Sequence, residues 1–164
     1  MSTTSQIQWP SGFETANCKV HVHNELAMTS VPETVWAWLI RAQLWPTWYP
    51  NSANIEFLTG QPPNLALGTR FRWKTFGITI ESNVLEFVPN ERLAWDAHGT
   101  GLNVYHAWLI QKTNEGCKVI TEENQGGVVA QLGKTLRPTR MEKMHQIWLE
   151  GLSARASTGL PPEL

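Results

Sequence analysis

The sequence has few charged residues, and their signs nearly cancel. Asp, Glu, Lys and Arg make up 16% of its 164 residues, against about 25% in an average soluble domain. Lys and Arg number 13 against 14 Asp and Glu, so the formal net charge is -1. Because such a chain carries no uniform positive field that would attract phosphate groups, we expect no nucleic acid partner.

Long apolar runs and cysteines are also scarce. The longest apolar run, residues 35–40, is far shorter than the roughly 18 residues that a membrane helix needs. No apolar stretch follows a cationic start at Met1, so we expect a soluble, cytoplasmic protein without a membrane span. Cys18 and Cys117 lie far apart in the sequence and are expected to remain reduced thiols in that compartment.

Tryptophan, by contrast, is abundant. The chain has nine Trp beside two Tyr and five Phe, and 41% of its residues are hydrophobic. A chain of this length buries about 68–70% of the surface that it exposes when unfolded, so one domain folds without disulfides or a structural metal. Each indole brings a large apolar surface and one N–H group that needs a partner. So many indoles indicate a wide apolar interior that is not completely filled.

Composition divides the chain into three parts. Residues 1–17 are polar without strand or helix periodicity, which predicts a leader that lies on the domain or moves freely. Residues 18–156 carry the periodic patterns of the domain itself. Residues 157–164 contain Gly159, Pro161 and Pro162, which predict a disordered or loosely attached tail.

Alternation of apolar and polar residues predicts a strand over residues 18–28 and a run of six antiparallel strands between Asn54 and Glu123. Between them, Thr29 and Ser30 offer an N-cap and Pro32 opens a short helix. The two prolines of residues 44–50 limit the next helix to a brief turn. After a helical stretch broken at Pro138, a long amphipathic helix is expected from about residue 139 to residue 156.

Hairpin turns set which residues share the inner face of this sheet. A two-residue turn at residues 76–77 would pair Trp73 with Ile80. After a further turn at residues 89–90, the turn at residues 99–101 is expected to place Ala97 opposite Leu102. This continues the inner face through the residues Trp95, Val104, His106, Trp108 and Ile110.

The register of the last hairpin stays open between two alternatives. A loop of two or four residues would place Glu123 opposite His106, whereas a loop of three residues would turn Glu122 inward.

The order of elements predicts an α+β fold: a curved seven-stranded antiparallel sheet wrapped around a long C-terminal helix, with two short helices after the first strand. Over about residues 20–156 the chain resembles the START/Bet v 1-like (SRPBCC) superfamily, and within it the polyketide cyclase/dehydrase and lipid-transport branch. The resemblance is carried, in chain order, by VPETVWAWLI, WPTWYP, ERLAWD, YHAWLIQKTNEGCKVITEEN and MEKMHQIWLEGL. It implies a helix-grip fold with a deep apolar cavity, used across the superfamily to bind, carry, cyclise or dehydrate hydrophobic molecules.

Residues expected to bind the ligand lie on the inner sheet face and on one stripe of the long helix. They are Phe71, Trp73, Ile80, Trp95, Val104, His106, Trp108, Met141, Met144, His145 and Trp148.

Three polar residues on these faces are candidates for chemistry. His106, among apolar neighbours, is a candidate general acid or base, and Glu123 opposite it would orient the imidazole and raise its pKa. A structural His–Glu pair in the core would give the same sequence pattern. His145 either completes a polar patch or lies on the helix surface beside Trp148.

Other groupings point away from metals, nucleotides and nucleic acid. His21 and His23 share a strand face, but that face is the solvent side and offers no third ligand, so no metal site is assigned. The row Arg70, Arg72 and Lys74 lies opposite the aromatic face of its strand, which excludes joint base stacking and phosphate contact. The sequence has no dinucleotide fingerprint and no phosphate-binding loop. We therefore expect no cofactor.

The residues leave three functions open. The leading hypothesis is binding of a hydrophobic small molecule, lipid or polyketide-like, in an internal cavity. The alternative is a polyketide cyclase or dehydrase that uses His106 and Glu123 as an acid–base pair, and the third is a protein-interaction module without a ligand. Trp45, Trp48 and Tyr49 either border the cavity entrance or staple the short helices to the sheet. The sequence identifies neither the ligand nor the oligomeric state.

Overall fold

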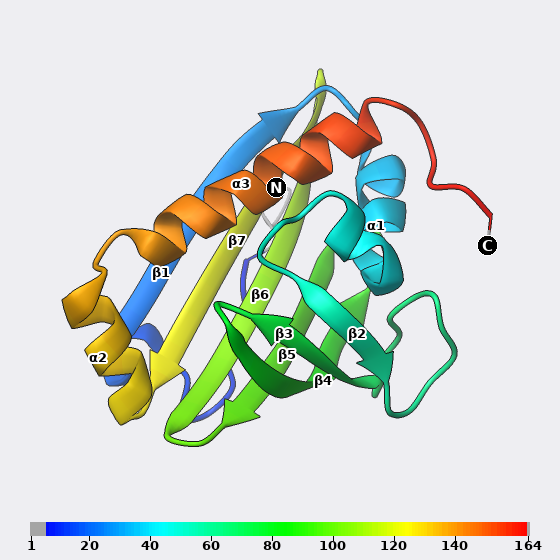
Figure 1. The fold of residues 1–164 in the computed structure, drawn as a ribbon. Helices are drawn as coiled ribbons and strands as arrows, with labels where there is room; N and C mark the ends of the chain where they lie inside the picture. The colour runs from blue at the N-terminus through cyan, green and yellow to red at the C-terminus, as the bar shows by residue number, and fades with distance from the viewer. Residues whose placement is uncertain (1–5, 164) are drawn as a thin grey trace.

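The computed structural model describes residues 6–163, which fold into one antiparallel sheet and three α-helices (Figure 1). The seven strands are ordered β1-β7-β6-β5-β4-β3-β2 across the sheet. They are β1 (Val20–Met28), β2 (Ala53–Phe57), β3 (Arg70–Thr75), β4 (Ile78–Val88), β5 (Arg92–Gly99), β6 (Leu102–Thr113) and β7 (Gly116–Gly126). The helices are α1 (Pro32–Ile40), α2 (Val128–Leu136) and α3 (Arg140–Ala156), with 3-10 turns η1 (Thr15–Asn17) and η2 (Ala42–Thr47). The predicted helix-grip architecture is confirmed.

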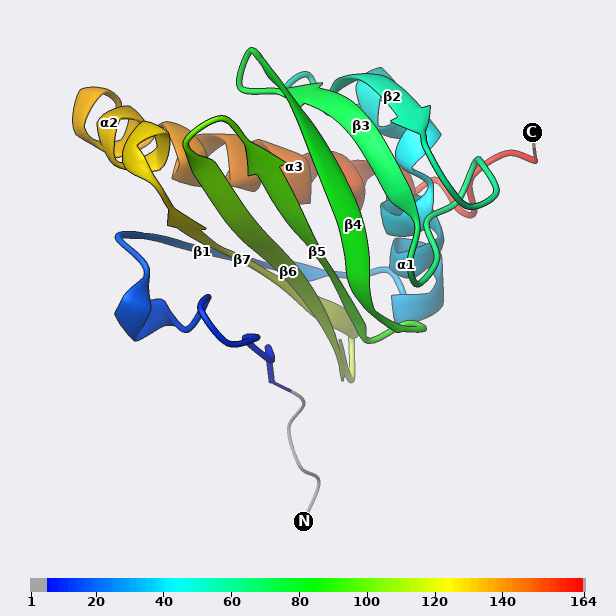
Figure 2. The same ribbon diagram turned by 90° about the horizontal axis from the view of Figure 1, so that it is seen from below.

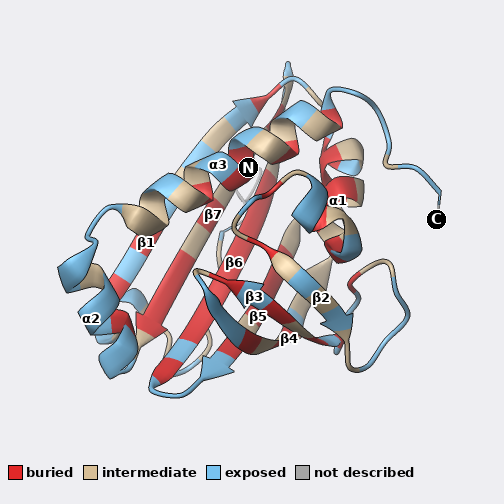
Figure 3. Cartoon of the chain, viewed as in Figure 1, coloured by how far each residue is buried: buried red, intermediate tan, exposed pale blue. Residues whose placement is uncertain are grey.

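Helix α3 lies across the concave face of the sheet, with α2 and α1 at its two ends (Figures 1 and 2). Its buried residues recur at helical spacing: His145, Trp148, Leu149, Leu152 and Ala156. Buried residues also follow β6 and β7 beneath it (Figure 3). The apolar core therefore sits between the sheet and α3. No helix among residues 6–163 is long and apolar enough to cross a membrane.

The structure confirms the predicted register of one hairpin and corrects that of a second. It also decides the register of the last hairpin, which the sequence left open. Thr75 pairs with Ile78 around Phe76 and Gly77, whose φ angles of 51° and 83° suit a two-residue turn. The expected pairing of Ala97 with Leu102 was wrong, because the turn is two residues long and Ala97 pairs with Val104. This slip of two residues leaves the same side chains facing inward.

In the last hairpin, Thr113 pairs with Gly116 and His106 pairs with Glu123. Glu123, and not Glu122, therefore shares the inner face with His106.

The described part of the leader, residues 6–17, lies on the outer face of the sheet (Figure 2). Its apolar residues Ile7, Trp9 and Phe13 pack against Ala94, Tyr105 and Ala107. The buried Asn124 side chain donates hydrogen bonds to the Phe13 carbonyl oxygen at 2.7 Å and to the Thr15 hydroxyl at 3.1 Å. The described residues of the leader therefore lie on the domain, which is one of the two alternatives that the sequence left open. Residues 1–5 lie outside the described part.

The described part of the C-terminal tail, up to residue 163, is attached to α1, contrary to the expectation of a loose end. The buried Trp38 indole donates a hydrogen bond of 2.7 Å to the Gly159 carbonyl oxygen. Arg41 donates another to the carbonyl oxygen of Pro162. A buried indole N–H needs an acceptor, and the tail supplies it.

The short helices are fastened to the sheet by aromatic side chains. Trp45 is fully buried and its ring lies 5.5 Å from that of Trp95 and 5.2 Å from that of Trp148. Tyr49 stacks on Trp148 with ring centroids 4.3 Å apart. Trp45 thus fastens η2 to the sheet and to α3, whereas Tyr49 fastens the segment after η2 to α3. At the start of α1 the N-cap is Val31, without a side-chain hydrogen bond, in place of the expected Thr29 or Ser30.

Candidate functional site

A cavity of about 430 Å³ lies between the inner sheet face and helices α2 and α3. Residues of strands β3 to β7 line one side of the cavity and residues of α3 the other, and the largely exposed helix α2 borders its mouth. The predicted ligand-binding residues that line it are Trp73, Ile80, Trp95, Val104, His106, Met141, His145 and Trp148. Large apolar side chains therefore make up most of the wall, as binding of an apolar molecule requires.

Three buried polar side chains meet on this wall. His106 Nδ1 from β6 and His145 Nε2 from α3 lie 3.3 and 3.0 Å from Glu123 Oε2 of β7. The three side chains are 3%, 1% and 8% exposed for His106, His145 and Glu123. The antiparallel pairing of β6 and β7 fixes two of the residues, and the helical stripe of α3 brings the third. We call these three residues the inner triad.

Further hydrogen bonds orient the inner triad. His106 Nε2 lies 2.7 Å from Thr121 Oγ1, and Thr121 is fully buried. The Gln125 amide donates to Glu123 Oε1, which leaves Oε2 facing the two histidines. The carboxylate of Glu123 can only accept, so the proton shared with His145 belongs to Nε2.

Burial decides the protonation of His106. It lowers the pKa of His106 from 6.5 to about 3, although the nearby Glu123 carboxylate acts in the opposite direction. Glu123 does raise this pKa, as expected, but the loss of hydration on burial outweighs the attraction of one carboxylate, so the net shift is downward.

The Glu123 carboxyl is shifted toward its ionised form. Burial raises its pKa, but His106, His145 and the Gln125 amide outweigh that effect and lower the pKa from 4.5 to about 2. Near neutral pH the inner triad therefore holds an ionised Glu123 and a neutral His106.

Two polar atoms at the cavity wall have no protein partner among the described residues. They are Nδ1 of His145 and the indole Nε1 of Trp148, both buried and both on residues that line the cavity. A buried polar atom without a hydrogen bond costs about 1–3 kcal/mol. No protein group among the described residues offsets this cost.

Most of the sequence matches one family model. Residues 19–157 match the family described as polyketide cyclase / dehydrase and lipid transport. The chain belongs to this family. A search of curated protein sequences finds no match.

Solved structures show how widely this family's fold is shared. Hypothetical protein jhp0584 from Helicobacter pylori is 34% identical with a TM-score of 0.87, over 95% of this chain and 99% of that one. The di-domain ARO/CYC StfQ from the steffimycin biosynthetic pathway is 15% identical with a TM-score of 0.72, over 88% of this chain and 53% of that one. Ara h 8.0201 is 13% identical with a TM-score of 0.66, over 85% and 99%. The last two share the fold alone.

Three residues expected in the ligand site of this family member lie outside the cavity wall. Phe71 and Trp108 are 0% and 1% exposed and belong to the packed core. Trp108 packs edge-on against Trp148, with ring centroids 4.9 Å apart. Met144 is half-buried on α3 and does not line the cavity. Alternation along a strand identifies the side chains that face inward. It does not show which of them are covered by other core side chains and so do not reach the cavity.

Sequence reasoning missed the contribution of α2 to the mouth. The α2 residues that line the cavity there are Val129, Ala130, Gly133, Lys134 and Leu136, and Arg137 and Arg140 follow them after the helix and at the start of α3. The signal was present, since the apolar residues of positions 128, 129, 132 and 136 fall on one stripe of a helix. Part of this stripe remains in solvent: Val128, Leu132 and Leu136 are 75%, 59% and 70% exposed.

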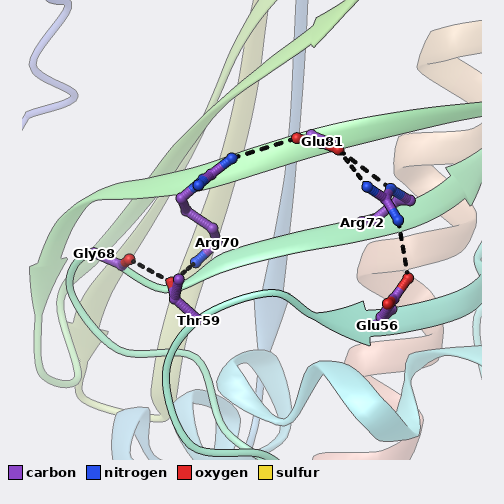
Figure 4. A network of polar contacts seen from close by, with 6 residues as sticks. All are labelled: Glu56, Thr59, Gly68, Arg70, Arg72 and Glu81. Carbon is purple, nitrogen blue, oxygen red and sulfur yellow. Dashed lines mark hydrogen bonds and ion pairs between the residues drawn. The ribbon is translucent and has the colours of Figure 1, made fainter.

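The remaining sequence candidates lie away from the cavity. His21 and His23 are exposed and contact Asn124 and Glu122 on the outer face of the sheet. Arg70 and Arg72 form ion pairs with Glu81, and Arg72 also with Glu56 (Figure 4). The expected solvated outer face accounts for this basic row.

Proposed function

We propose that the chain binds a hydrophobic small molecule, lipid or polyketide-like, in this cavity. The observation that carries the proposal is an apolar cavity with a buried polar cluster, the inner triad, on its wall. Burying apolar surface contributes about 25 cal/mol per Å² to binding, and the few polar groups orient the ligand. A ligand with one oxygen function would place it beside Nδ1 of His145 and leave its apolar part against the tryptophans.

The size of the cavity supports this proposal. Ligand sites commonly span about 300–1,000 Å³, and about 430 Å³ is available here. Trp73, Trp95 and Trp148 supply flat walls from three different elements, which suits ring systems and acyl chains alike. Met141 near the mouth adds a flexible side chain that adapts to different ligands.

Acid–base catalysis, as in a cyclase or dehydrase, is the second candidate, and the unpartnered Nδ1 of His145 favours it. Glu123 holds the Nε2–H of His145, so Nδ1 can accept a proton from the carbon next to a ligand ketone. The electron pair would move to the carbonyl oxygen, and the enolate carbon would bond to a second carbonyl of the same molecule. The oxygen of the second carbonyl would take the proton back from Nδ1. Nδ1 would then accept the remaining proton of the attacking carbon and give it to the departing hydroxyl, which would leave as water. In this scheme His145 takes the role first expected of His106, whose two ring nitrogens both face protein partners.

The experiment fills the cavity without removing any packing. Val104 lines the cavity on β6, so Val104→Phe should occupy the ligand's space, whereas Leu85→Phe on β4, 45% exposed, is the matched control. Tryptophan fluorescence is titrated with fatty acids, aromatic polyketides and sterols. We expect saturable quenching for the wild type and for Leu85→Phe, and an affinity at least about tenfold weaker for Val104→Phe. Equal affinity in all three proteins, or no response to any ligand, would overturn the proposal.

Catalysis is tested separately on the same proteins. A diketone-bearing analogue that binds should be turned over by the wild type and not by His145→Gln, while its binding remains. Turnover that survives in His145→Gln would remove the second candidate.

A further inference from the structure

We propose that the inner triad is also a binding site for one divalent transition-metal ion, with Zn²⁺ as the ion that its donors suit. His106 and His145 offer two imidazole nitrogens and Glu123 one carboxylate oxygen, all within 4.8 Å of one another. The site would leave one coordination position open toward the cavity. It requires no organic ligand, so it stands independently of the proposed function.

The distances between the donor atoms support this site. Zinc binds nitrogen and oxygen at about 2.0–2.1 Å in tetrahedral geometry, which places neighbouring donors roughly 3.3 Å apart. Glu123 Oε2 already lies 3.3 Å from His106 Nδ1 and 3.0 Å from His145 Nε2. Only the distance between the two imidazole nitrogens needs to shorten for the three donors to surround one ion. The ion would replace the proton that His145 shares with Glu123.

The neighbours of two of the three donors, His106 and Glu123, are arranged as metal ligands require, whereas Nδ1 of His145 has no partner among the described residues. A ligating imidazole usually donates its second N–H to a protein acceptor, and Thr121 Oγ1 lies 2.7 Å from His106 Nε2. The Gln125 amide occupies Oε1 of Glu123, which leaves Oε2 for an ion. Both supporting residues are buried and lie on β7, as does Glu123. The strand therefore fixes one donor together with two supporting side chains.

The donor set and surroundings indicate the class of ion and its partner. Two imidazoles and one carboxylate suit Zn²⁺ and its first-row neighbours, whereas Mg²⁺ and Ca²⁺ prefer oxygen donors alone. The rings of Trp95 and Trp148 lie 5.0 and 5.4 Å from that of His106 and supply no competing ligand. With one carboxylate, the site would keep one positive charge. The open position would therefore favour an anionic or carbonyl oxygen at the end of an apolar molecule.

The test uses the full chain, stripped with EDTA and without any organic ligand. Calorimetric titration with Zn²⁺ should show one ion per chain, and the stoichiometric binding should be lost in Glu123→Gln and in His145→Gln. His23→Gln, which removes an exposed histidine of the outer face, is the control and should bind as the wild type does. Thr121→Val should weaken binding about 10–100-fold, because it removes the acceptor for His106. Binding that is lost in His23→Gln and kept in His145→Gln would overturn the proposal.

A second measurement on the wild type does not depend on the variants folding. X-ray absorption of the Zn²⁺-loaded protein should show a shell of nitrogen and oxygen at about 2.0–2.1 Å with imidazole scattering. A sulfur shell at about 2.3 Å, or no bound zinc after gel filtration, would contradict the site. The fluorescence titrations of the metal-free protein report the apolar ligand separately, so failure of one proposal is distinguishable from failure of the other.

Discussion

Two carboxylates on opposite faces of the sheet each lie between two basic side chains. On the outer face, Glu81 lies 3.5 Å from Arg70 and 2.7 Å from Arg72, and these side chains are 44%, 54% and 43% exposed (Figure 4). On the inner face, Glu123 lies 3.3 and 3.0 Å from its histidines, and no side chain of the inner triad exceeds 8% exposure. The arrangement is similar, but only one of the two networks is removed from water.

This difference separates a solvated network on the protein surface from a buried one. Exposed ion pairs are solvated and screened, so they add little to stability. A buried charged cluster loses its hydration, and apolar side chains of similar volume would often be as stable or more stable. The burial of the inner triad therefore agrees with the ligand site that we propose, whereas the outer network is a solvated strand face.

Breaking the inner network should have the largest effect. His145→Leu leaves the buried Glu123 carboxylate with one partner fewer, so the free energy of unfolding should fall by about 3 kcal/mol. Urea denaturation at pH 7 measures it. Adding Glu123→Leu to this variant removes the stranded charge and should recover part of the lost free energy of unfolding. A double variant destabilised by more than the sum of the two single variants would contradict the account.

Acid should weaken the fold through the same network. Unfolding returns His106 from a pKa of about 3 to 6.5 and Glu123 from about 2 to 4.5. In both cases the unfolded chain binds more protons, so the free energy of unfolding should decrease as pH falls from about 6.5 toward 3. Urea denaturation at several pH values tests this. In His106→Gln, the free energy of unfolding should change less between pH 6.5 and pH 5 than it does in the wild type. An unchanged pH dependence would assign the effect to other groups.

The outer face also carries a packed layer, and removing part of it should have an intermediate effect. Phe13 is half-buried against Tyr105, with ring centroids 5.6 Å apart. Phe13→Ala should lower the free energy of unfolding by about 1–2 kcal/mol, since it exposes apolar surface of the sheet. Ligand binding in the cavity should not change. A thermal melt together with a fluorescence titration checks both statements, and lost binding would show that the two faces are coupled.

The smallest effect should come from the exposed network. Arg72→Gln removes ion pairs with Glu81 and Glu56 that lie in solvent, so the denaturation midpoint should change little. Whatever change occurs should shrink further in high salt. A loss comparable to that of His145→Leu would mean that the contrast between the two networks is wrong.

Much of the fold could be predicted because side-chain alternation tolerates errors in register. The pairing of Ala97 was misplaced by two residues, yet the inner face stayed correct, since strands repeat every two residues. The pairing of Trp73 with Ile80 was right because residues 76–77 form a turn of unambiguous length. The turn around Thr100 was ambiguous, since both of its neighbours are glycines and two loop lengths fit.

The site was harder to predict because it depends on how α3 is placed. His145 lies on the predicted stripe, but its depth is set by packing between elements far apart in the sequence. One such contact is at Gly151, where an added Cβ would lie 2.9 Å from the Trp48 carbonyl oxygen. This close approach seats α3 against η2. Likewise, the burial that lowers the pKa of His106 comes from tryptophans on three elements, and no local pattern reports it.

The central claim is that the cavity holds an apolar molecule, and native mass spectrometry of the freshly purified protein tests it most directly. We expect one small apolar molecule per chain, released on denaturing extraction and absent from Val104→Phe, with Leu85→Phe as the matched control. The same bound mass in Val104→Phe would contradict the account. So would a wild type that carries no ligand and does not bind fatty acids, aromatic polyketides or sterols.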